Sequence, residues 1–126
     1  MIKSLYKKIE IFLLFYDVTN IESFDEIKKL LDTIIQEKGK NDNYELLLIG
    51  NKIDEKEKRI VGDSTAIKLA EENNMRYIEC SCLMKINVFE ILNEITIMAY
   101  RKSFNKDNES RALSKFGNKK NNKKCC

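Results

Sequence analysis

Three polar side chains follow one buried segment of the sequence, and their chemistry matches the edge of a purine base. Asn51, Lys52 and Asp54 lie in the segment Gly50-Asn51-Lys52-Ile53-Asp54, directly after the apolar run 44–49. A carboxylate accepts two hydrogen bonds in a fork, and guanine offers two neighbouring donors, its ring N–H and its amino group. Adenine has an acceptor at the ring position, so Asp54 would select guanine. An ordinary turn after a strand is the alternative for this segment taken alone.

The spacing of apolar residues predicts the elements that position this segment. Short, nearly continuous apolar runs indicate buried strands, and apolar residues recurring every three to four positions indicate amphipathic helices. The strands are predicted at residues 9–17, 44–49 and 76–80. The helices are predicted at residues 21–38, 63–72 and 87–102, with Asn20 or Thr19, Asp63 and Asn87 as N-caps and Gly39 as a stop.

The alternation of three strands with three helices predicts an α/β fold with a parallel sheet and right-handed crossovers. Ligands bind to such sheets at the carboxyl ends of the strands. Residues 51–54 and 81–83 follow two of the predicted strands, so we expect them to form one site. Tyr16 and Asp17 are interpreted as the end of the first strand rather than as catalytic residues.

Three ordered motifs resemble the second half of a Rab-type small GTPase of the Ras superfamily. They read YDVTNIESF from Tyr16, GNKID from Gly50 and ECSCL from Glu79, and the resemblance covers roughly residues 5–102 and the last two residues. It implies a partial Ras-like (P-loop NTPase) fold, whose sheet order is 2-3-1-4-5-6 and whose first half is missing here. GNKID and the EKEKRIV that follows loosely resemble the Rabs related to Rab eighteen.

The resemblance also implies roles for individual residues. The guanine-binding residues would be Asn51, Lys52, Asp54, Ser81, Cys82 and Leu83. Asp54 would accept from the base with support from Ser81, and the backbone N–H of Cys82 would donate to the guanine carbonyl oxygen. Leu83 stands where the family usually has a lysine whose stem covers the base. We therefore expect somewhat weaker base binding, but not its loss.

The motifs that hold phosphate and magnesium in this family are absent from the sequence. The four glycines, Gly39, Gly50, Gly62 and Gly117, do not form the G-x-x-x-x-G-K-[ST] loop, and no Asp precedes a glycine by three positions. Full-length relatives hydrolyse GTP with Mg²⁺, but this chain alone is expected to be inactive, with no catalytic and no metal-binding residue. An incomplete gene model or a short transcript would explain the omission, which leaves the strand at 9–17 as an open hydrophobic edge.

The end of the chain differs from its body in charge and composition. Residues 1–102 carry 16 Lys and Arg against 18 Asp and Glu, a net charge of −2, whereas residues 103–126 carry 7 against 2, a net charge of +5. The sequence therefore predicts a small GTPase body at 1–102 and a disordered basic tail at 103–126. The resemblance implies that Cys125 and Cys126 are geranylgeranylated, since two lipids anchor stably where one does not. Exposed thiols that bind metal are the alternative.

Composition and resemblance together set the expected partners and location. The sequence contains no histidine, which removes His-based acid–base catalysis and metal ligation. No apolar stretch approaches the ~20 residues of a membrane span. We expect the chain on the cytoplasmic face of endomembranes (endoplasmic reticulum, Golgi or vesicles), with a cytosolic pool. The implied partners are GTP or GDP, the Rab escort and geranylgeranyl transferase, the GDP-dissociation inhibitor and effectors, but no nucleic acid.

Two functions follow from these expectations. The leading one is a guanine-nucleotide-binding switch of vesicle traffic. The alternative is a non-catalytic, lipid-anchored interaction module that competes for the Rab escort or for effectors.

Overall fold

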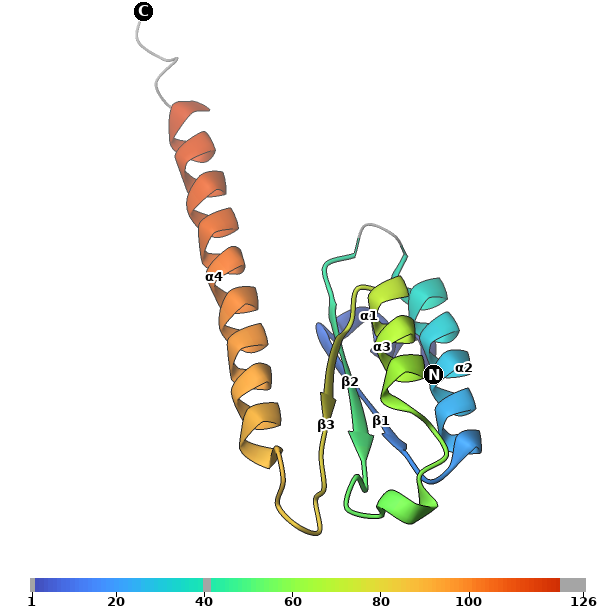
Figure 1. The fold of residues 1–126 in the computed structure, drawn as a ribbon. Coiled ribbons are helices and arrows are strands. Elements are labelled where there is room, and N and C mark those ends of the chain that lie inside the picture. Colours follow the sequence, from blue (N-terminus) through green and yellow to red (C-terminus); the bar gives the residue numbers. More distant parts are fainter. Residues whose placement is uncertain (1, 40–41, 121–126) are drawn as a thin grey trace, which may run out of the picture.

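A three-stranded parallel sheet lies between two layers of helices in the computed structural model, which describes residues 2–39 and 42–120 (Figure 1). The elements are α1 (Ile2–Lys8), β1 (Ile11–Asp17), α2 (Ile21–Lys38), β2 (Glu45–Asn51), the 3-10 turn η1 (Lys56–Lys58), α3 (Asp63–Glu72), β3 (Arg76–Glu79) and α4 (Val88–Lys120). The strand order is β1-β2-β3, and both pairs are parallel. The predicted α/β class is confirmed. Helix α1 was not predicted.

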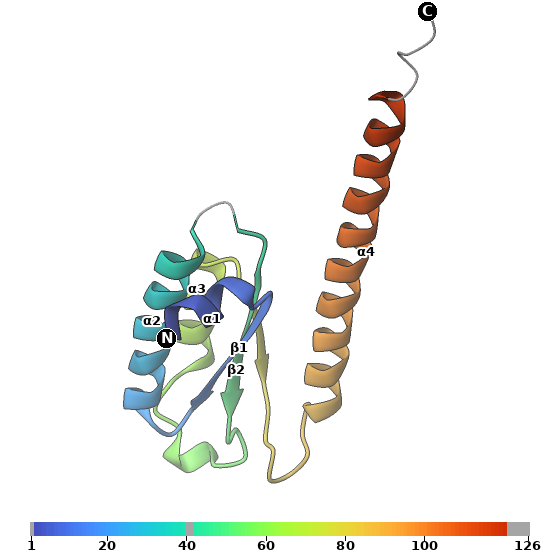
Figure 2. The same ribbon diagram turned by 180° about the vertical axis from the view of Figure 1, so that it is seen from behind.

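Each face of the sheet carries its own hydrophobic cluster. Along β1 the side chains of Phe12, Leu14 and Tyr16 point to the face covered by α2 and α3, where they pack around Phe24. On the other face, Leu47 and other side chains of β2 and β3 pack against α4. The residues of this second cluster are Leu47, Ile49, Cys80, Ile91 and Met98. Figure 2 shows α4 alone on that side of the sheet.

Local sequence signals explain both ends of α2. The side chain of Asn20 accepts a hydrogen bond from the Ser23 N–H at 3.1 Å, as the predicted N-cap should. Gly39 has a φ of 77° and donates its N–H to the Ile35 carbonyl oxygen at 3.1 Å. That positive φ favours glycine, so the predicted stop is confirmed.

The predicted cap at Asp63 is wrong, whereas Asn87 directly precedes α4 and its carbonyl oxygen accepts the Ile91 N–H at 3.1 Å. Gly62 precedes α3, and Asp63 is its first residue, with a carboxylate that accepts from the adjacent Ser64 N–H at 2.7 Å. Asn87 has a φ of 58°, and its side-chain amide donates to the Glu79 carbonyl oxygen at 2.8 Å. Asn87 therefore holds the loop that enters α4 against the end of β3.

Residues 103–120, which the sequence analysis assigns to the basic tail, continue α4 as one helix in the structure (Figure 1). A segment of low hydrophobicity cannot fold alone, but a helix that has already nucleated extends at little cost. Residues 103–120 contain no proline that would stop it. Lys106 also pairs with Glu10 at 2.5 Å, which ties this stretch to the body. The remaining residues, with Cys125 and Cys126, lie outside the described ranges.

Strand β1 forms one edge of the sheet, as the sequence predicts. Its only strand neighbour in the described part of the chain is β2. Leu13 and Phe15 of this strand face the side of α4, yet their exposed fractions are 39% and 49%. Helix α4 therefore covers β2 and β3 better than it covers the edge strand.

Gly50 is the glycine of β2, and a side chain at this position would have little room. A Cβ atom there would lie 2.7 Å from the hydroxyl oxygen of Tyr16, whose side chain is buried. We expect Gly50→Ala to lower the free energy of unfolding by ~1–3 kcal/mol, the usual cost of overpacking. The measurement is urea denaturation followed by circular dichroism.

A second variant isolates the contact responsible for that cost. Tyr16→Phe removes the hydroxyl group that the new Cβ would meet, so Gly50→Ala should cost less in the Tyr16→Phe background than in the wild type. Equal costs in both backgrounds would show that the hydroxyl group is not the obstacle.

Candidate guanine-recognition site

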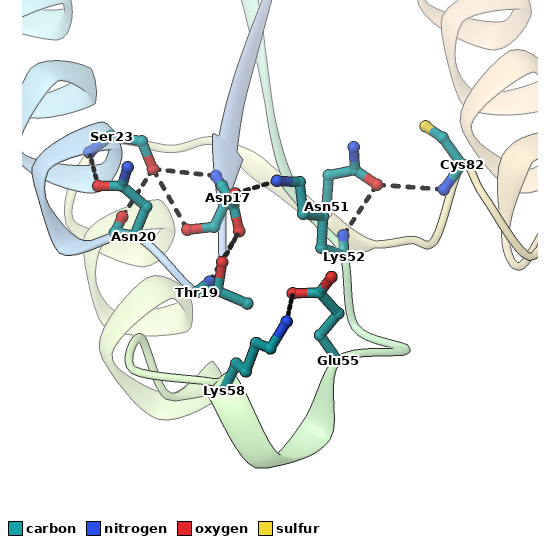
Figure 3. A network of polar contacts seen from close by, with 9 residues as sticks. All are labelled: Asp17, Thr19, Asn20, Ser23, Asn51, Lys52, Glu55, Lys58 and Cys82. Atoms are coloured by element: carbon teal, nitrogen blue, oxygen red, sulfur yellow. Dashed lines mark hydrogen bonds and ion pairs between the residues drawn. The ribbon is translucent and has the colours of Figure 1, made fainter.

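Side chains from all three strand ends meet at the carboxyl edge of the sheet. Asp17 ends β1 and Asn51 ends β2, where the two residues are register partners, and the Ser81–Leu83 loop begins two residues after β3. Figure 3 shows Asn51 between the Asp17 cluster and Cys82. The structure therefore brings two of the predicted loops to one place, with the end of β1 beside them.

Asn51 ties the loops together through its side-chain oxygen. This Oδ1 accepts the backbone N–H of Cys82 at 3.1 Å and the N–H of Lys52 at 2.8 Å (Figure 3). The thiol of Cys80 also lies 3.6 Å from it. An amide at this position thus bridges the loop after β2 and the loop after β3.

Ser81 holds the carboxylate of Asp54. The Ser81 hydroxyl group donates to Asp54 Oδ1 at 2.6 Å and accepts the Met84 N–H at 3.0 Å. Ser81 is fully buried, and its backbone forms an antiparallel bridge with Ile86. The hydroxyl group therefore orients one carboxylate oxygen of Asp54 from a buried position.

Lys52 has a strained backbone and an acidic partner. Its φ is 70°, which is uncommon for a residue with a side chain. Its ammonium group pairs with Asp17 at 2.6 Å, and Asp17 also accepts the N–H and the hydroxyl group of Thr19 at 2.8 and 2.6 Å. Burial favours a higher pKa for Asp17, but the hydrogen bonds from Lys52 and Thr19 outweigh it and lower that pKa.

The two remaining predicted residues stand in contrasting positions. Cys82 donates its backbone N–H to Asn51, so donation to a guanine carbonyl oxygen requires this bond to be shared or to shift. Leu83 is 80% exposed beside it and is free to cover an apolar surface.

The Cys80 thiol is buried, and burial raises its pKa to about 11, which keeps the thiol protonated and unreactive.

Neither a metal-binding cluster nor a membrane-spanning helix is found among the described residues. Within 2–39 and 42–120, no three His, Cys, Asp or Glu side chains are grouped so that they could hold a metal. No helix in the same ranges is long and apolar enough to cross a membrane.

Sequence reasoning missed two ion pairs beside these loops. Lys52 pairs with Asp17, which was interpreted only as a strand end. Arg59, in the loop before α3, pairs with Glu79 at the end of β3. Asp17 and Glu79 both lie inside the recognised motifs. Their place in those motifs was the only feature of the sequence that could have pointed to the two ion pairs.

The parallel strands and the joined loops at their carboxyl ends are those of an open α/β sheet, a class of fold that binds ligands at this edge. The model of the Ras family matches residues 1–101. The chain therefore belongs to the Ras family, as a partial and Rab-like small GTPase chain.

Individual relatives agree with this membership. The chain is 34% identical to the Ras-related protein Rab-10 of Diplobatis ommata over 116 residues, which are 90% of this chain and 57% of the relative. It is 35% identical to Ral-B of Mus musculus over 119 residues, 91% of this chain and 56% of the relative. The GTP-binding protein YPTM1 of Zea mays is 38% identical over 87 residues, 69% of this chain and 41% of the relative. The chain thus spans about half the length of the curated relatives it matches.

Proposed function

We propose that this chain supplies the guanine-recognition part of a Rab-type small GTPase that acts as a nucleotide switch in intracellular membrane traffic. The observation that best supports this proposal is the 2.6 Å hydrogen bond from the Ser81 hydroxyl group to Asp54. It lies beside the hydrogen bond from the Cys82 N–H to the Asn51 side chain. Together they place an oriented carboxylate next to a fixed backbone loop. That arrangement suits the two donors on one edge of guanine.

The base is the only part of the nucleotide for which this chain offers a complete set of groups. In this proposal Asp54 accepts from the ring N–H and the amino group, and Lys52 and Leu83 flank the two faces of the base. The Cys82 N–H meets the carbonyl oxygen when its bond to Asn51 is shared or shifts. The 126 residues contain no glycine-rich phosphate loop. Binding of phosphate and magnesium, and hence hydrolysis, would belong to a first half that the relatives have.

The test uses mononucleotides at millimolar concentration and the amide NMR spectrum of the chain. GMP should shift the signals of residues 51–54 and 81–83, and AMP should shift them at least about tenfold less, because its ring nitrogen cannot donate to Asp54. Asp54→Asn should abolish the GMP response, since its amide would face the guanine amino group. XMP should then bind, because xanthine carries a carbonyl oxygen at that position.

Asp25→Asn is the matched control. Asp25 lies exposed on α2, where it forms an ion pair with Lys28 one turn further along the same helix. It should leave the GMP response unchanged. Equal responses to GMP and AMP in the wild-type chain would sink the proposed base selectivity.

The proposal extends to the membrane through Cys125 and Cys126, which we assign as geranylgeranylation sites. The Rab escort and transferase would deliver the lipids, and the GDP-dissociation inhibitor and effectors would bind the complete GTPase at the cytoplasmic face of endomembranes. The supporting observations are the terminal Cys-Cys pair and the lysines before it, Lys119, Lys120, Lys123 and Lys124. Each lysine near an anionic surface adds roughly 1 kcal/mol.

Replacing both Cys125 and Cys126 by serine should release the protein from membranes. A single replacement should release it partially, because one lipid anchors only marginally. The measurement is fractionation of tagged protein with prenyl labelling of each variant, and the control is Cys82→Ser, which leaves the terminal pair intact. Label on the double variant, or a labelled wild type that stays wholly soluble, would contradict the anchoring.

The terminal Cys125-Cys126 pair also fits a second candidate, a non-catalytic interaction module. Such a module would be lipid-anchored and would compete for the Rab escort or effectors. A transcript that encodes a glycine-rich loop upstream of Met1 would decide against it.

A further inference from the structure

A chain of four side chains crosses the whole sheet just below the candidate site. Arg59 donates to both carboxylate oxygens of Glu79, one of these bonds being 3.1 Å long. Glu79 accepts the Tyr77 hydroxyl group at 2.5 Å, and Tyr77 lies 2.9 Å from the hydroxyl group of Tyr16. The path therefore joins the loop before α3 to β3 and then to β1.

Gly50 makes room for this path. Tyr16 of β1, Gly50 of β2 and Glu79 of β3 are direct register partners, so they stand side by side on one face of the sheet. The middle position has no side chain, and the Tyr16 hydroxyl oxygen lies only 2.7 Å from where a Cβ of residue 50 would be. The two tyrosines can therefore meet across β2.

The charges fix the direction of every bond in the path. Burial favours a higher pKa for Glu79, but hydrogen bonds from Arg59 and Tyr77 outweigh it and lower that pKa, so the carboxylate is ionised near neutral pH. Burial and the carboxylate raise the pKa of Tyr77, which keeps its hydroxyl group protonated. Tyr77 must donate to Glu79, and Tyr16 must then donate to Tyr77.

The path is attached to both loops of the candidate site. Arg59 follows Asp54 in the same loop, and Glu79 directly precedes the segment that contains Ser81. The two loops are thus joined at their bases by Arg59 and Glu79 and at their tips by the Ser81 hydroxyl group on Asp54. Between these points the Ile53 N–H donates to the Cys80 carbonyl oxygen at 3.2 Å.

We propose that Arg59 and Tyr77 are positioning residues for guanine recognition, which act through Glu79 to hold the loop 52–61 against β3. Bidentate contact between a guanidinium group and a carboxylate restrains orientation as well as distance. The Nε of Arg59 also donates to the Val61 carbonyl oxygen at 2.8 Å, so this side chain closes the end of its own loop. The inference rests on the proposed function for the choice of ligand, but not for the restraint on the loop.

Two measurements on the full chain distinguish the restraint on the loop 52–61 from its effect on guanine recognition. Amide hydrogen exchange of residues 52–61 reports the restraint without any ligand. Arg59→Ala should speed this exchange about tenfold or more, and Tyr77→Phe, which keeps Arg59 on Glu79, should have a smaller effect in the same direction. Arg59→Lys should recover only part of the protection, because an ammonium group cannot form the fork. Lys58→Ala, one residue away and exposed, is the control.

The second readout is the ratio of GMP-induced to AMP-induced amide shifts at Cys82. Arg59→Ala should lower this ratio, Arg59→Lys should recover part of it, and Lys58→Ala should not change it. A role confined to overall stability would change the unfolding midpoint but not this ratio in molecules that remain folded.

The possible outcomes are distinct. If Arg59→Ala and Lys58→Ala exchange alike, the restraint is refuted. If exchange rises but the ratio is unchanged, Arg59 does not position the base site. If the wild-type chain shows no GMP response, the proposed function fails while the exchange experiment still decides the restraint. Should Arg59→Ala not fold, the smaller change in Tyr77→Phe carries both readouts, and wild-type behaviour there overturns the proposal.

Discussion

The purified 126-residue chain is expected to lose GTP and GDP during desalting. Base recognition contributes a few hydrogen bonds of ~1 kcal/mol each, and the entropy lost on association cancels most of that gain. We therefore expect a Kd of about 1 mM or weaker. Titration calorimetry or the fluorescence of a labelled GDP measures it. Sub-micromolar binding would mean that the chain reaches phosphate by a route that its motifs do not show.

A chimera tests the physical reason for this weakness. Placing the first half of a Rab relative before residue 1 adds a phosphate loop without changing Asp54 or Ser81. We expect it to bind GDP at least about a thousandfold more tightly, and Asp54→Asn in the chimera should reduce that gain. A chimera that folds but binds no better than the chain alone would show that the site residues are not arranged for a nucleotide.

The second large effect concerns the open edge at β1. The isolated chain should self-associate at micromolar concentration, because an unpaired edge strand with exposed Leu13 and Phe15 is a template for pairing. Phe15→Lys places a charge on the exposed side of that strand and should shift the chain toward monomer. Light scattering after size-exclusion chromatography measures this shift.

Leu113→Lys is the matched control, because it removes an exposed leucine from the distant end of α4, where 72% of Leu113 is accessible. It should leave the association unchanged. A wild-type monomer that melts cooperatively above ~65 °C, beyond the usual range of mesophile domains, would show that the edge is no liability.

Periodicity predicted most of the fold, and its failures have physical causes. The buried strands were found as short, nearly continuous apolar runs, and α2 was found because its apolar residues recur every three to four positions. Helix α1 was missed because its seven residues, Ile2–Lys8, are too few to show a helical repeat. The continuation of α4 beyond residue 102 was missed because composition reports whether a segment can fold alone, not whether a neighbouring helix extends into it.

The sequence predicted which loops form the candidate site, but not which side chains pair within it. Motifs placed Asn51, Asp54 and Ser81 together because each follows a strand, and parallel strands end at one edge. The partners of Lys52 and Arg59 could not be predicted, because Asp17 and Glu79 are distant in the sequence and many other carboxylates could have paired with them. The bond between Cys82 and Asn51 was missed because the resemblance assigns that N–H to a ligand.

Helix α4 alters what a lipid at the chain terminus could do. From residue 103 to Lys120 it adds roughly 27 Å of helix at 1.5 Å per residue, and Figures 1 and 2 show it running past the sheet. A flexible chain of the same number of residues would have a mean end-to-end distance of about 23 Å. The distance that the segment spans would therefore be similar whether it is helical or flexible. The difference lies in orientation, because a helix fixes the direction of Lys120 relative to the sheet, whereas a flexible chain would let the two turn independently. The carboxyl edge that carries Asn51 and Asp54 therefore keeps a fixed direction relative to the far end of the described helix, set by the helix axis.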